Sequence, residues 1–366
     1  MILMNDFKKE YEYFEPQVTK ILRWVLASGY YILSKNVEEF EKEFAKYIGA
    51  KYCVGVGNGL EALQIALMSI DVKQGDEVIT VSNTAVATAL AISNIGAKPV
   101  FVDIDEYYHM DVSKIEEKIT KKTKAIIPVH LFGQIVDIDN ILKIAKKHNL
   151  KVIEDACQAH GASLDGKKAG SFGSLGCFSF YPTKNLGAYG DAGAITTDSK
   201  TLYQKCLMLR NYGQKNRYEH HLKGMNSRLD ELQAAILNTK LKKLNSLLSK
   251  RNKIAQTYIF NLKGVNQIIL PKIRKNNYHS FHLFVILAEN RDKLQKYLKE
   301  KGTETIIHYP IPIHKQVSFK EYANVKLPVT EKLSKEILSL PINPFLEERE
   351  VIEICSAIKH FYQNEE

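Results

Sequence analysis

A lysine lies between two apolar, strand-like segments, where a charged side chain is unusual and indicates a chemical role. Lys184 stands in the segment GCFSFYPTKNLGAYGDAGAITT, close to Gly187, Gly190 and Gly193. Lysines normally lie at the surface, and a desolvated ammonium loses its proton readily, so that the free amine can form a Schiff base with an aldehyde. The alternative is an exposed loop lysine. The glycines favour the chemical role because they let the backbone close tightly on a ligand.

Two carboxylates end another apolar segment, KVIED. Glu154 and Asp155 are followed by Gln158 and His160. At the carboxyl end of a parallel strand such a side chain points into the ligand crevice, where it can pair with a cationic group of a cofactor. Alternatively Asp155 caps the next segment, and for this residue taken alone capping is the commoner role.

A glycine cluster, GVGNG at residues 55–59, follows a strand-like segment and precedes a helical one. Backbone N–H groups and a helix N-terminus at this place favour a bound phosphate. A dinucleotide fingerprint needs a third glycine where this chain has Leu60, although Asp76 and Glu77 follow at about the expected distance. NAD binding is therefore weakly supported, and a tight turn without a ligand is the other alternative.

Together these three features match the needs of one cofactor. Pyridoxal phosphate (PLP) needs a cradle for its phosphate, an anion opposite its pyridine nitrogen and a lysine for its aldehyde. Lys184 and Asp155 supply the lysine and the anion, and residues 57–59 with Ser179 are available for the phosphate. No metal site is expected, since the five cysteines are unclustered and lack C-x-x-C spacing.

The elements that hold these residues alternate between strands and helices over residues 51–212. Helical patterns lie between most of the early strands, for example at 61–70 and 137–148. This order predicts an α/β fold with a mainly parallel sheet and crossover helices. The expected strands are YCVGVG (52–57), EVITV (77–81), PVFVD (99–103), KAIIPV (124–129), KVIED (151–155), GCFSF (176–180) and AGAITT (192–197).

Near residue 227 the pattern changes. Residues 227–230 resemble a capping box that opens a long amphipathic helix reaching about residue 262. We expect a domain boundary inside that helix, with a large domain at 1–245 and a smaller α+β domain at 246–366. The elements expected further on are a strand at 279–287, a helix at 291–302, a strand running into a proline-rich loop at 303–313 and a helix at 347–362.

The composition excludes several classes of protein. The 366 residues exceed what one core usually organises, and 51 Lys and Arg against 41 Asp and Glu leave a net charge of +10. The basic residues are scattered through helical stretches, which indicates a solvated surface and no nucleic-acid partner. No long apolar run or export signal occurs, so we expect no membrane span. The odd, unclustered cysteines fit a reduced, cytoplasmic location.

Almost end to end, the sequence resembles the DegT/DnrJ/EryC1/StrS aminotransferases, which act on nucleotide-linked keto sugars. The resemblance implies the aspartate aminotransferase fold (fold type I), PLP as cofactor and sugar amination as the activity. It is carried by the segments SGYYILSKNVEEFEKEFAKYIGAKYCVGVGNGLEAL, GDEVITVSNTAVATALA, IPVHLFGQ, IEDACQAHGA, FSFYPTKNLGAYGDAGAITT, GMNSRLDELQAAIL and IHYPIPIH.

The resemblance also implies roles for individual residues. Lys184 would form the Schiff base with the cofactor, Asp155 would hold the pyridine nitrogen protonated, and Gln158 would contact the cofactor's phenolic oxygen. Acting as base, Lys184 would also move the proton that leaves the amino donor. The phosphate contacts would be Asn58, Gly59 and Ser179.

A homodimer is implied as the minimal unit, because Asn226 would reach the cofactor phosphate of the neighbouring subunit. For the nucleotide sugar we expect residues just before Asn226 and residues of a carboxyl-terminal loop, each of which could instead be a plain surface residue. These are Arg217, Tyr218 and His220 for the diphosphate, and His308 and Tyr309 for the sugar.

The implied reaction has two halves that share one site. L-glutamate, the donor implied by the resemblance, leaves its amine on the cofactor as pyridoxamine phosphate (PMP), and the keto sugar then takes it up. The segments NGLEAL, HLFGQ and EDACQAHGA look closer to the branch that aminates C-3 of dTDP-3-keto-6-deoxyhexoses, giving 3-amino-3,6-dideoxy sugars. Amination at C-4 is the alternative.

One departure from the family concerns the ring that usually covers the cofactor, because this chain has Ala85 at that place. Three rival functions are disfavoured. A dehydratase of the same family would carry histidine in place of Lys184, and an NAD-dependent sugar oxidoreductase would leave Lys184 and Asp155 unexplained. A non-catalytic regulator would need an appended DNA-binding domain, for which we expect no room in this chain.

Overall fold

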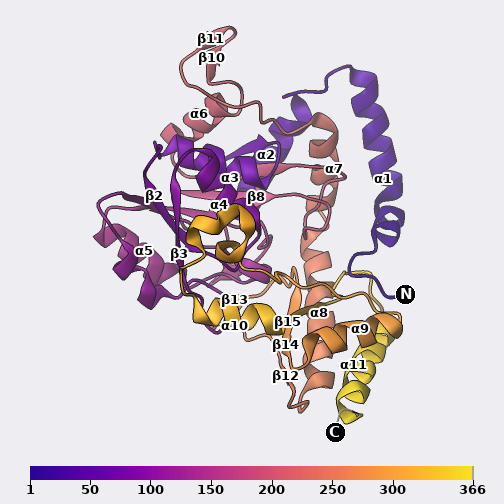
Figure 1. The fold of residues 1–366 in the computed structure, drawn as a ribbon. Helices are drawn as coiled ribbons and strands as arrows, with labels where there is room; N and C mark the ends of the chain where they lie inside the picture. Colours follow the sequence, from indigo (N-terminus) through magenta and orange to yellow (C-terminus); the bar gives the residue numbers. More distant parts are fainter. Residues whose placement is uncertain (365–366) are drawn as a thin grey trace.

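The computed structural model describes residues 1–364, which form a helix-flanked sheet and a smaller α/β unit below it in the view of Figure 1. The large sheet has seven strands in the order β1-β9-β8-β5-β4-β2-β3. Its strands are β1 (Tyr52–Val56), β2 (Glu77–Val81), β3 (Lys98–Val102), β4 (Thr123–Ile126), β5 (Lys151–Asp155), β8 (Leu175–Ser179) and β9 (Gly193–Thr197). All seven match strands expected from the sequence.

The sheet is mainly parallel, as predicted. β3, β2, β4, β5 and β8 pair in parallel, whereas β9 runs antiparallel to both β8 and β1. β1 therefore runs in the same direction as the parallel strands. As a result, the carboxyl ends of β1, β2, β4, β5 and β8 meet at one edge of the sheet.

Both faces of the sheet are covered by apolar side chains. Neighbouring residues along a strand enter different cores: Cys53, Ile79 and Phe178 enter one, Val54 and Cys177 the other. This alternation follows from the pleat, and two buried faces explain why the strands read as continuous apolar runs. The helices are α1 (Phe7–Ser28), α2 (Lys35–Ile48), α3 (Gly59–Ser69), α4 (Val86–Asn94), α5 (Ile138–Lys147), α6 (Lys200–Leu209), α7 (Glu231–Leu241), α8 (Leu244–Leu262), α9 (Arg291–Glu300), α10 (Pro328–Glu336) and α11 (Glu348–Gln363).

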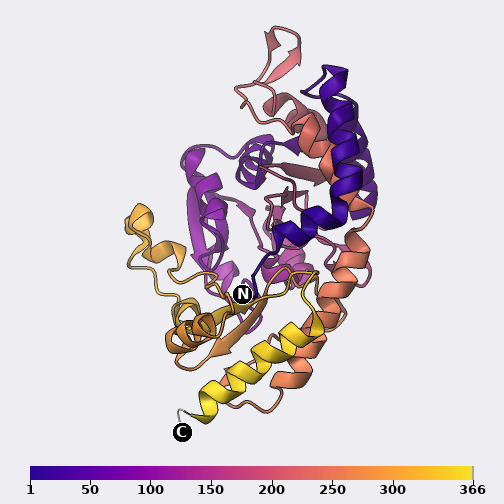
Figure 2. The same ribbon diagram turned by 90° about the vertical axis from the view of Figure 1, so that its right-hand side faces the viewer.

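The smaller unit packs α8, α9 and α11 against a three-stranded sheet, and α11 lies along α8 in Figure 2. Its sheet pairs β14 (Phe284–Ala288) with β12 (Ile268–Ile269) and β15 (Ile337–Leu340). The division of the chain into domains at residues 245 and 246 stays a prediction. The remaining strands are short: β6 (Ser163–Leu164), β7 (Lys167–Lys168), β10 (Gln214–Asn216), β11 (Glu219–His220) and β13 (Asn277–Tyr278).

The predicted capping box at 227–230 is wrong. The helix begins at Glu231, and the Asp230 side chain makes no capping hydrogen bond. Ser227 is buried, and its hydroxyl accepts the Gly57 N–H at 3.0 Å. The Glu231 carboxylate instead accepts three N–H groups at the start of α2, from Ser34, Asn36 and Val37. Hydrogen bonds to residues far away in the sequence thus replace the local capping bonds that the sequence suggested.

Two further predictions need correction. The long helix expected up to residue 262 is interrupted after Leu241 and starts again at Leu244. Residues 303–313 form no regular strand but two isolated bridges, from Thr303 to Ile2 and from Ile306 to Ser339. Ser339 belongs to the strand β15, which the sequence did not indicate. Pro310 and Pro312 lack the N–H that a strand ladder needs. The strand expected at 279–287 begins only at Phe284, as β14.

None of the helices described in residues 1–364 combines the length and the apolar character needed to cross a membrane.

Candidate active site

The carboxyl-terminal edge of the large sheet surrounds a cavity of about 360 Å³. Five strands contribute to its wall because they end at this edge. Six of the residues expected at the cofactor line it together, although they come from three separate parts of the chain. They are Asn58, Gly59, Asp155, Gln158, Ser179 and Lys184.

Lys184 projects from the turn between β8 and β9, and its side chain is partly exposed at the cavity wall. The turn is closed by two hydrogen bonds, from the Lys184 N–H to the Tyr181 carbonyl at 2.8 Å and from the Ala188 N–H to the Phe180 carbonyl at 2.7 Å. Desolvation lowers the pKa of its ammonium, against the opposing effect of Cys157 and Asp155. A larger share of neutral amine is therefore present here than on a surface lysine.

Asp155 is the last residue of β5 and is 5% exposed. One carboxylate oxygen accepts the hydroxyl of Thr88 at 2.8 Å, and the other accepts the N–H of Cys157 at 3.2 Å. The alternative role as a helix cap does not apply, because no helix follows between residues 156 and 162. The carboxylate is thus held at the cavity wall, where it can face a cationic group.

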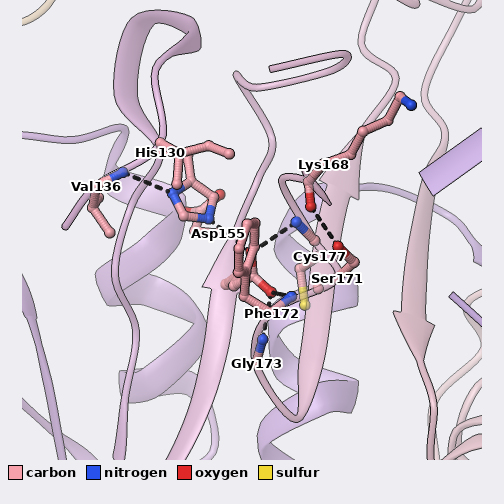
Figure 3. Close-up of polar contacts among 12 residues, drawn as sticks. His130, Val136, Asp155, Lys168, Ser171, Phe172, Gly173 and Cys177 are labelled. Carbon is pink, nitrogen blue, oxygen red and sulfur yellow. Dashed lines mark hydrogen bonds and ion pairs between the residues drawn. The ribbon is translucent and has the colours of Figure 1, made fainter. Parts of the chain in front are cut away.

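Glu154, the other carboxylate of this strand, serves the backbone. It is fully buried and accepts the N–H groups of Gly170, Phe172 and Gly173 at 2.6 to 2.7 Å. It also accepts the Nε2–H of His130 at 2.9 Å, and the Val136 N–H donates to the other nitrogen of that ring (Figure 3). Glu154 therefore fixes the loop that leads into β8, and through it the start of the strand that delivers Ser179.

The phosphate cradle expected at the glycine cluster begins with Asn58, which caps α3. Its side-chain oxygen accepts the Glu61 N–H at 2.9 Å and its carbonyl accepts the Ala62 N–H at 3.0 Å. By helix geometry the N–H groups of Gly59 and Leu60 are left for an anion. A Cβ at Gly59 would lie 2.7 Å from the Ser179 Cβ and 3.0 Å from the Cys157 Sγ, so only glycine fits this close approach.

Gln158 is held from two sides. Its amide oxygen accepts the Phe132 N–H at 3.0 Å, and its amide nitrogen donates to the Tyr309 hydroxyl at 3.1 Å. Tyr309, from the carboxyl-terminal part of the chain, thus contacts a residue of the cavity wall, and burial raises the pKa of its hydroxyl to about 12. The neighbouring His308 ring bonds to the Ser339 hydroxyl at 2.9 Å, and burial together with Lys184 lowers the pKa of His308 to about 4.

Like His308 and Tyr309, four other predicted residues are not among those that line this cavity. Arg217, Tyr218 and His220 lie exposed on the β10–β11 hairpin, which projects from the top of the molecule in Figure 1. The guanidinium of Arg217 lies 5.2 Å from the centre of the Tyr218 ring, and the Nδ1–H of His220 donates to the Tyr212 carbonyl at 3.0 Å. Asn226 is also exposed and bridges to Asn211.

Sequence reasoning missed several residues of the cavity wall, although most of them follow strands of the sheet. Ala85, already noted as the departure from the family, lies at this wall before α4, and Tyr181, which was not expected, brings an aromatic ring to the same wall. Two of the missed residues are Thr84 and Thr88. The position of Thr84 just after β2 could have indicated it, since ligand-facing residues follow parallel strands. The missed lining residues with polar groups are Thr84, Thr88, Cys157, Tyr181 and Asp191.

Comparison with known proteins agrees with this geometry. Residues 13–359 match the DegT/DnrJ/EryC1/StrS aminotransferase family. The chain belongs to this family. A dTDP-3-amino-3,6-dideoxy-alpha-D-galactopyranose transaminase from Aneurinibacillus thermoaerophilus is 47% identical over 99% of both chains. A Geobacillus stearothermophilus protein named pleiotropic regulatory protein is 45% identical over 99% of this chain and 98% of its own.

The fold agrees as well. The solved structure of Streptomyces venezuelae DesV in complex with a ketimine intermediate has a TM-score of 0.96, at 40% identity over 99% of this chain and 98% of that one. The fold is therefore that of the PLP-dependent aminotransferases, as the resemblance implied. Like other DegT/DnrJ/EryC1/StrS aminotransferases, this chain is a PLP-dependent sugar aminotransferase.

The cavity fits PLP on the chemistry of its own residues. The cofactor carries a phosphate, a pyridine nitrogen and an aldehyde, and the wall offers a helix N-terminus, the Asp155 carboxylate and the Lys184 amine. An NAD-binding Rossmann turn does not fit. Such a turn needs a parallel strand pair, whereas within residues 1–364 β1 pairs with β9 alone and runs antiparallel to it.

Proposed function

We propose that this aminotransferase uses L-glutamate to aminate a dTDP-linked 3-keto-6-deoxyhexose at C-3, giving a dTDP-3-amino-3,6-dideoxyhexose. The observation that carries the proposal is a cavity lined by Lys184 and Asp155 in a chain 47% identical to a transaminase named for such a sugar.

When bound, PLP supplies an aldehyde that takes up an amino group and a ring that accepts the electrons of a breaking C–H bond. The Asp155 carboxylate would accept a hydrogen bond from the ring nitrogen and so keep a proton there. Gln158, fixed by Phe132 and Tyr309, orients the ring from its side. The N–H groups at Gly59 and Leu60, together with the Ser179 hydroxyl, bind the phosphate.

Lys184 binds the aldehyde through Nζ and afterwards acts as the base. Burial lowers the pKa of its ammonium, so its free amine would take up at Nζ the proton that leaves the amino donor and hold it for return. The same residue serves both halves of the reaction, first with the donor and then with the keto sugar. Ping-pong kinetics follow from this shared use.

We further propose that the enzyme is a homodimer whose partner subunits complete each other's sites. Asn226 and the hairpin residues Arg217, Tyr218 and His220 are exposed and do not line their own cavity, which supports a role in a neighbouring one. Exposed apolar side chains, here called the patch, also occur at the end of α1 and just after it, where the Tyr31 carbonyl accepts the Glu231 N–H at 3.2 Å. Apolar patches of this kind mark interfaces. The patch consists of Trp24, Leu26, Tyr30, Tyr31 and Ile32.

The substrate is tested by incubating the purified protein, PLP and L-glutamate with the 3-keto or the 4-keto dTDP-6-deoxyhexose, and with a UDP-linked 3-keto sugar. Mass spectrometry and NMR then locate the new amine, and the Lys184→Ala protein is the control. We expect the amine at C-3 of the dTDP sugar and nothing from the control. Amination only at C-4, or only of the UDP sugar, would contradict the proposal.

A further inference from the structure

The Asp155 carboxylate is held by a buried pair of hydroxyl groups. Thr88, which is fully buried, donates its hydroxyl to Oδ2 of Asp155 at 2.8 Å, and the Thr84 hydroxyl lies 3.1 Å from that of Thr88. Thr84 is 4% exposed, and both residues line the cavity. Neither threonine has a role in the reaction as derived above.

The direction of these hydrogen bonds follows from proton counting. An ionised carboxylate only accepts, so the one hydroxyl proton of Thr88 is committed to Asp155. In the contact between the two threonines the hydroxyl of Thr84 must therefore donate. Both protons point toward Asp155, and such aligned hydrogen bonds polarise one another.

The hydroxyl pair is anchored on the backbone side as well. Thr84 and Thr88 flank the start of α4, where the Thr88 N–H donates to the Ala85 carbonyl at 3.1 Å. Just before them, Ser82 receives hydrogen bonds from two N–H groups of the carboxyl-terminal segment. The Ile313 N–H donates to its carbonyl at 3.1 Å and the His314 N–H to its hydroxyl at 3.0 Å. The threonines are thus presented by a segment fixed at both ends.

We propose that Thr88, oriented by Thr84, is a positioning residue that sets the orientation of the Asp155 carboxylate toward the pyridine nitrogen of the cofactor. The hydroxyl of Thr88 and the N–H of Cys157 occupy one acceptor position on each oxygen. They fix the plane of the carboxylate and leave its cavity side for the ring. This inference rests on the proposed function, since it needs Asp155 to face the cofactor.

Thr88→Val tests the inference, because it replaces the hydroxyl by a methyl group of nearly the same size. We expect kcat to fall about tenfold or more, the cost of removing a hydrogen bond to a charged group, while KM for the sugar and for glutamate changes less than about threefold. Independently of activity, the dissociation constant of PLP should rise. The pH at which the absorption bands of the bound cofactor interconvert should also shift.

Three further variants separate positioning from packing. Thr88→Ser keeps the hydroxyl and should recover most of the loss, whereas Thr84→Val should give a smaller loss than Thr88→Val. In an Asp155→Asn background, Thr88→Val should add little, because residues that act through one group are not additive. Melting temperatures verify that each variant is folded.

Wild-type spectra and kcat in Thr88→Val would overturn the positioning role, as would equal losses in Thr88→Ser and Thr88→Val or a fully additive loss with Asp155→Asn. These results leave the proposed function standing. If instead the wild-type protein binds no PLP, the proposed function fails and this inference with it. If it binds PLP but aminates another sugar, the spectral comparison decides the positioning role on its own.

Discussion

Adjacent carboxylates at the end of β5 have opposite tasks, and their hydrogen bonds explain why. Glu154 accepts hydrogen bonds from N–H groups of the loop at residues 170–173 and from His130. Both of its carboxylate oxygens are therefore occupied and cannot contact a ligand. Asp155 faces the other side of the strand and keeps part of its carboxylate for the cavity. Alternation along a strand therefore separates a structural acid from a chemical one.

The structural task of Glu154 is testable by Glu154→Gln. Any placement of the amide turns its NH₂ either toward the N–H groups of Phe172 and Gly173 or toward those of Gly170 and His130. We expect the free energy of unfolding, measured in urea, to fall by about 2 kcal/mol or more, because donors lose their acceptor in a buried place.

Glu116→Gln is the control for that measurement, since Glu116 pairs with Lys147 at the surface, where water screens the pair and a much smaller loss is expected. Equal losses of unfolding free energy in the two variants would contradict a structural role for the buried hydrogen bonds of Glu154.

At the residue scale, Lys184, Asp155, Gln158 and Ser179, expected at the cofactor, line one cavity because each lies at or just after the end of a strand; their roles stay predictions. The contact of Thr88 with Asp155 could not be predicted, since the two residues are 67 positions apart in the sequence. A single threonine also belongs to no motif that would indicate such a contact. The role of the exposed hairpin residues cannot be tested on one chain, because the site that they are proposed to complete belongs to a second subunit.

Among the elements, α1 and α7 are connected to the turn of Lys184 by one buried lysine. Lys240 on α7 is 4% exposed, forms an ion pair with Glu10 on α1 and donates to the Gly187 carbonyl at 2.7 Å. Its ammonium also lies 4.0 Å from the centre of the Tyr189 ring. Burial lowers the pKa of Lys240, and Glu10 opposes that effect. The reactive turn is thus supported from two helices.

Glu10→Gln should therefore destabilise the protein, because it leaves a buried ammonium without its carboxylate. We expect a loss of about 1–3 kcal/mol in urea unfolding, less than for a fully buried pair because Glu10 is 21% exposed. Adding Lys240→Met should recover part of it. Asp71→Asn, which breaks the more exposed pair with Lys205, is the matched control and should cost less than 1 kcal/mol. Equal costs would contradict a supporting role.

Elements within the large sheet were predicted well because each strand is a short apolar run with a turn signal on both sides. The errors lie where tertiary partners decide. Ser227 reads as a helix cap but bonds to Gly57, and the strand expected before the proline-rich loop is reduced to isolated bridges at Thr303 and Ile306. β15 was missed because it follows α10 without a turn signal.

At the scale of the whole molecule, the proposed dimer predicts complementation between inactive chains. Lys184→Ala lacks the amine and Asn226→Ala lacks the side chain proposed to reach the partner's cofactor. Mixed dimers should contain one site with both residues intact, so that mixing the variants restores about a quarter of wild-type activity, by random pairing of subunits. Each variant alone gives the baseline. No recovery despite demonstrated subunit exchange would contradict sites shared between subunits.

The central claim is that Lys184 holds PLP as a Schiff base, and borohydride reduction tests it most directly. The purified protein should show a visible absorption band that disappears on reduction, and peptide mass mapping should find the cofactor's mass on Lys184. The Lys184→Ala protein should acquire no label under the same treatment. A colourless protein that is reduced nowhere, or a label on another lysine, would contradict the account.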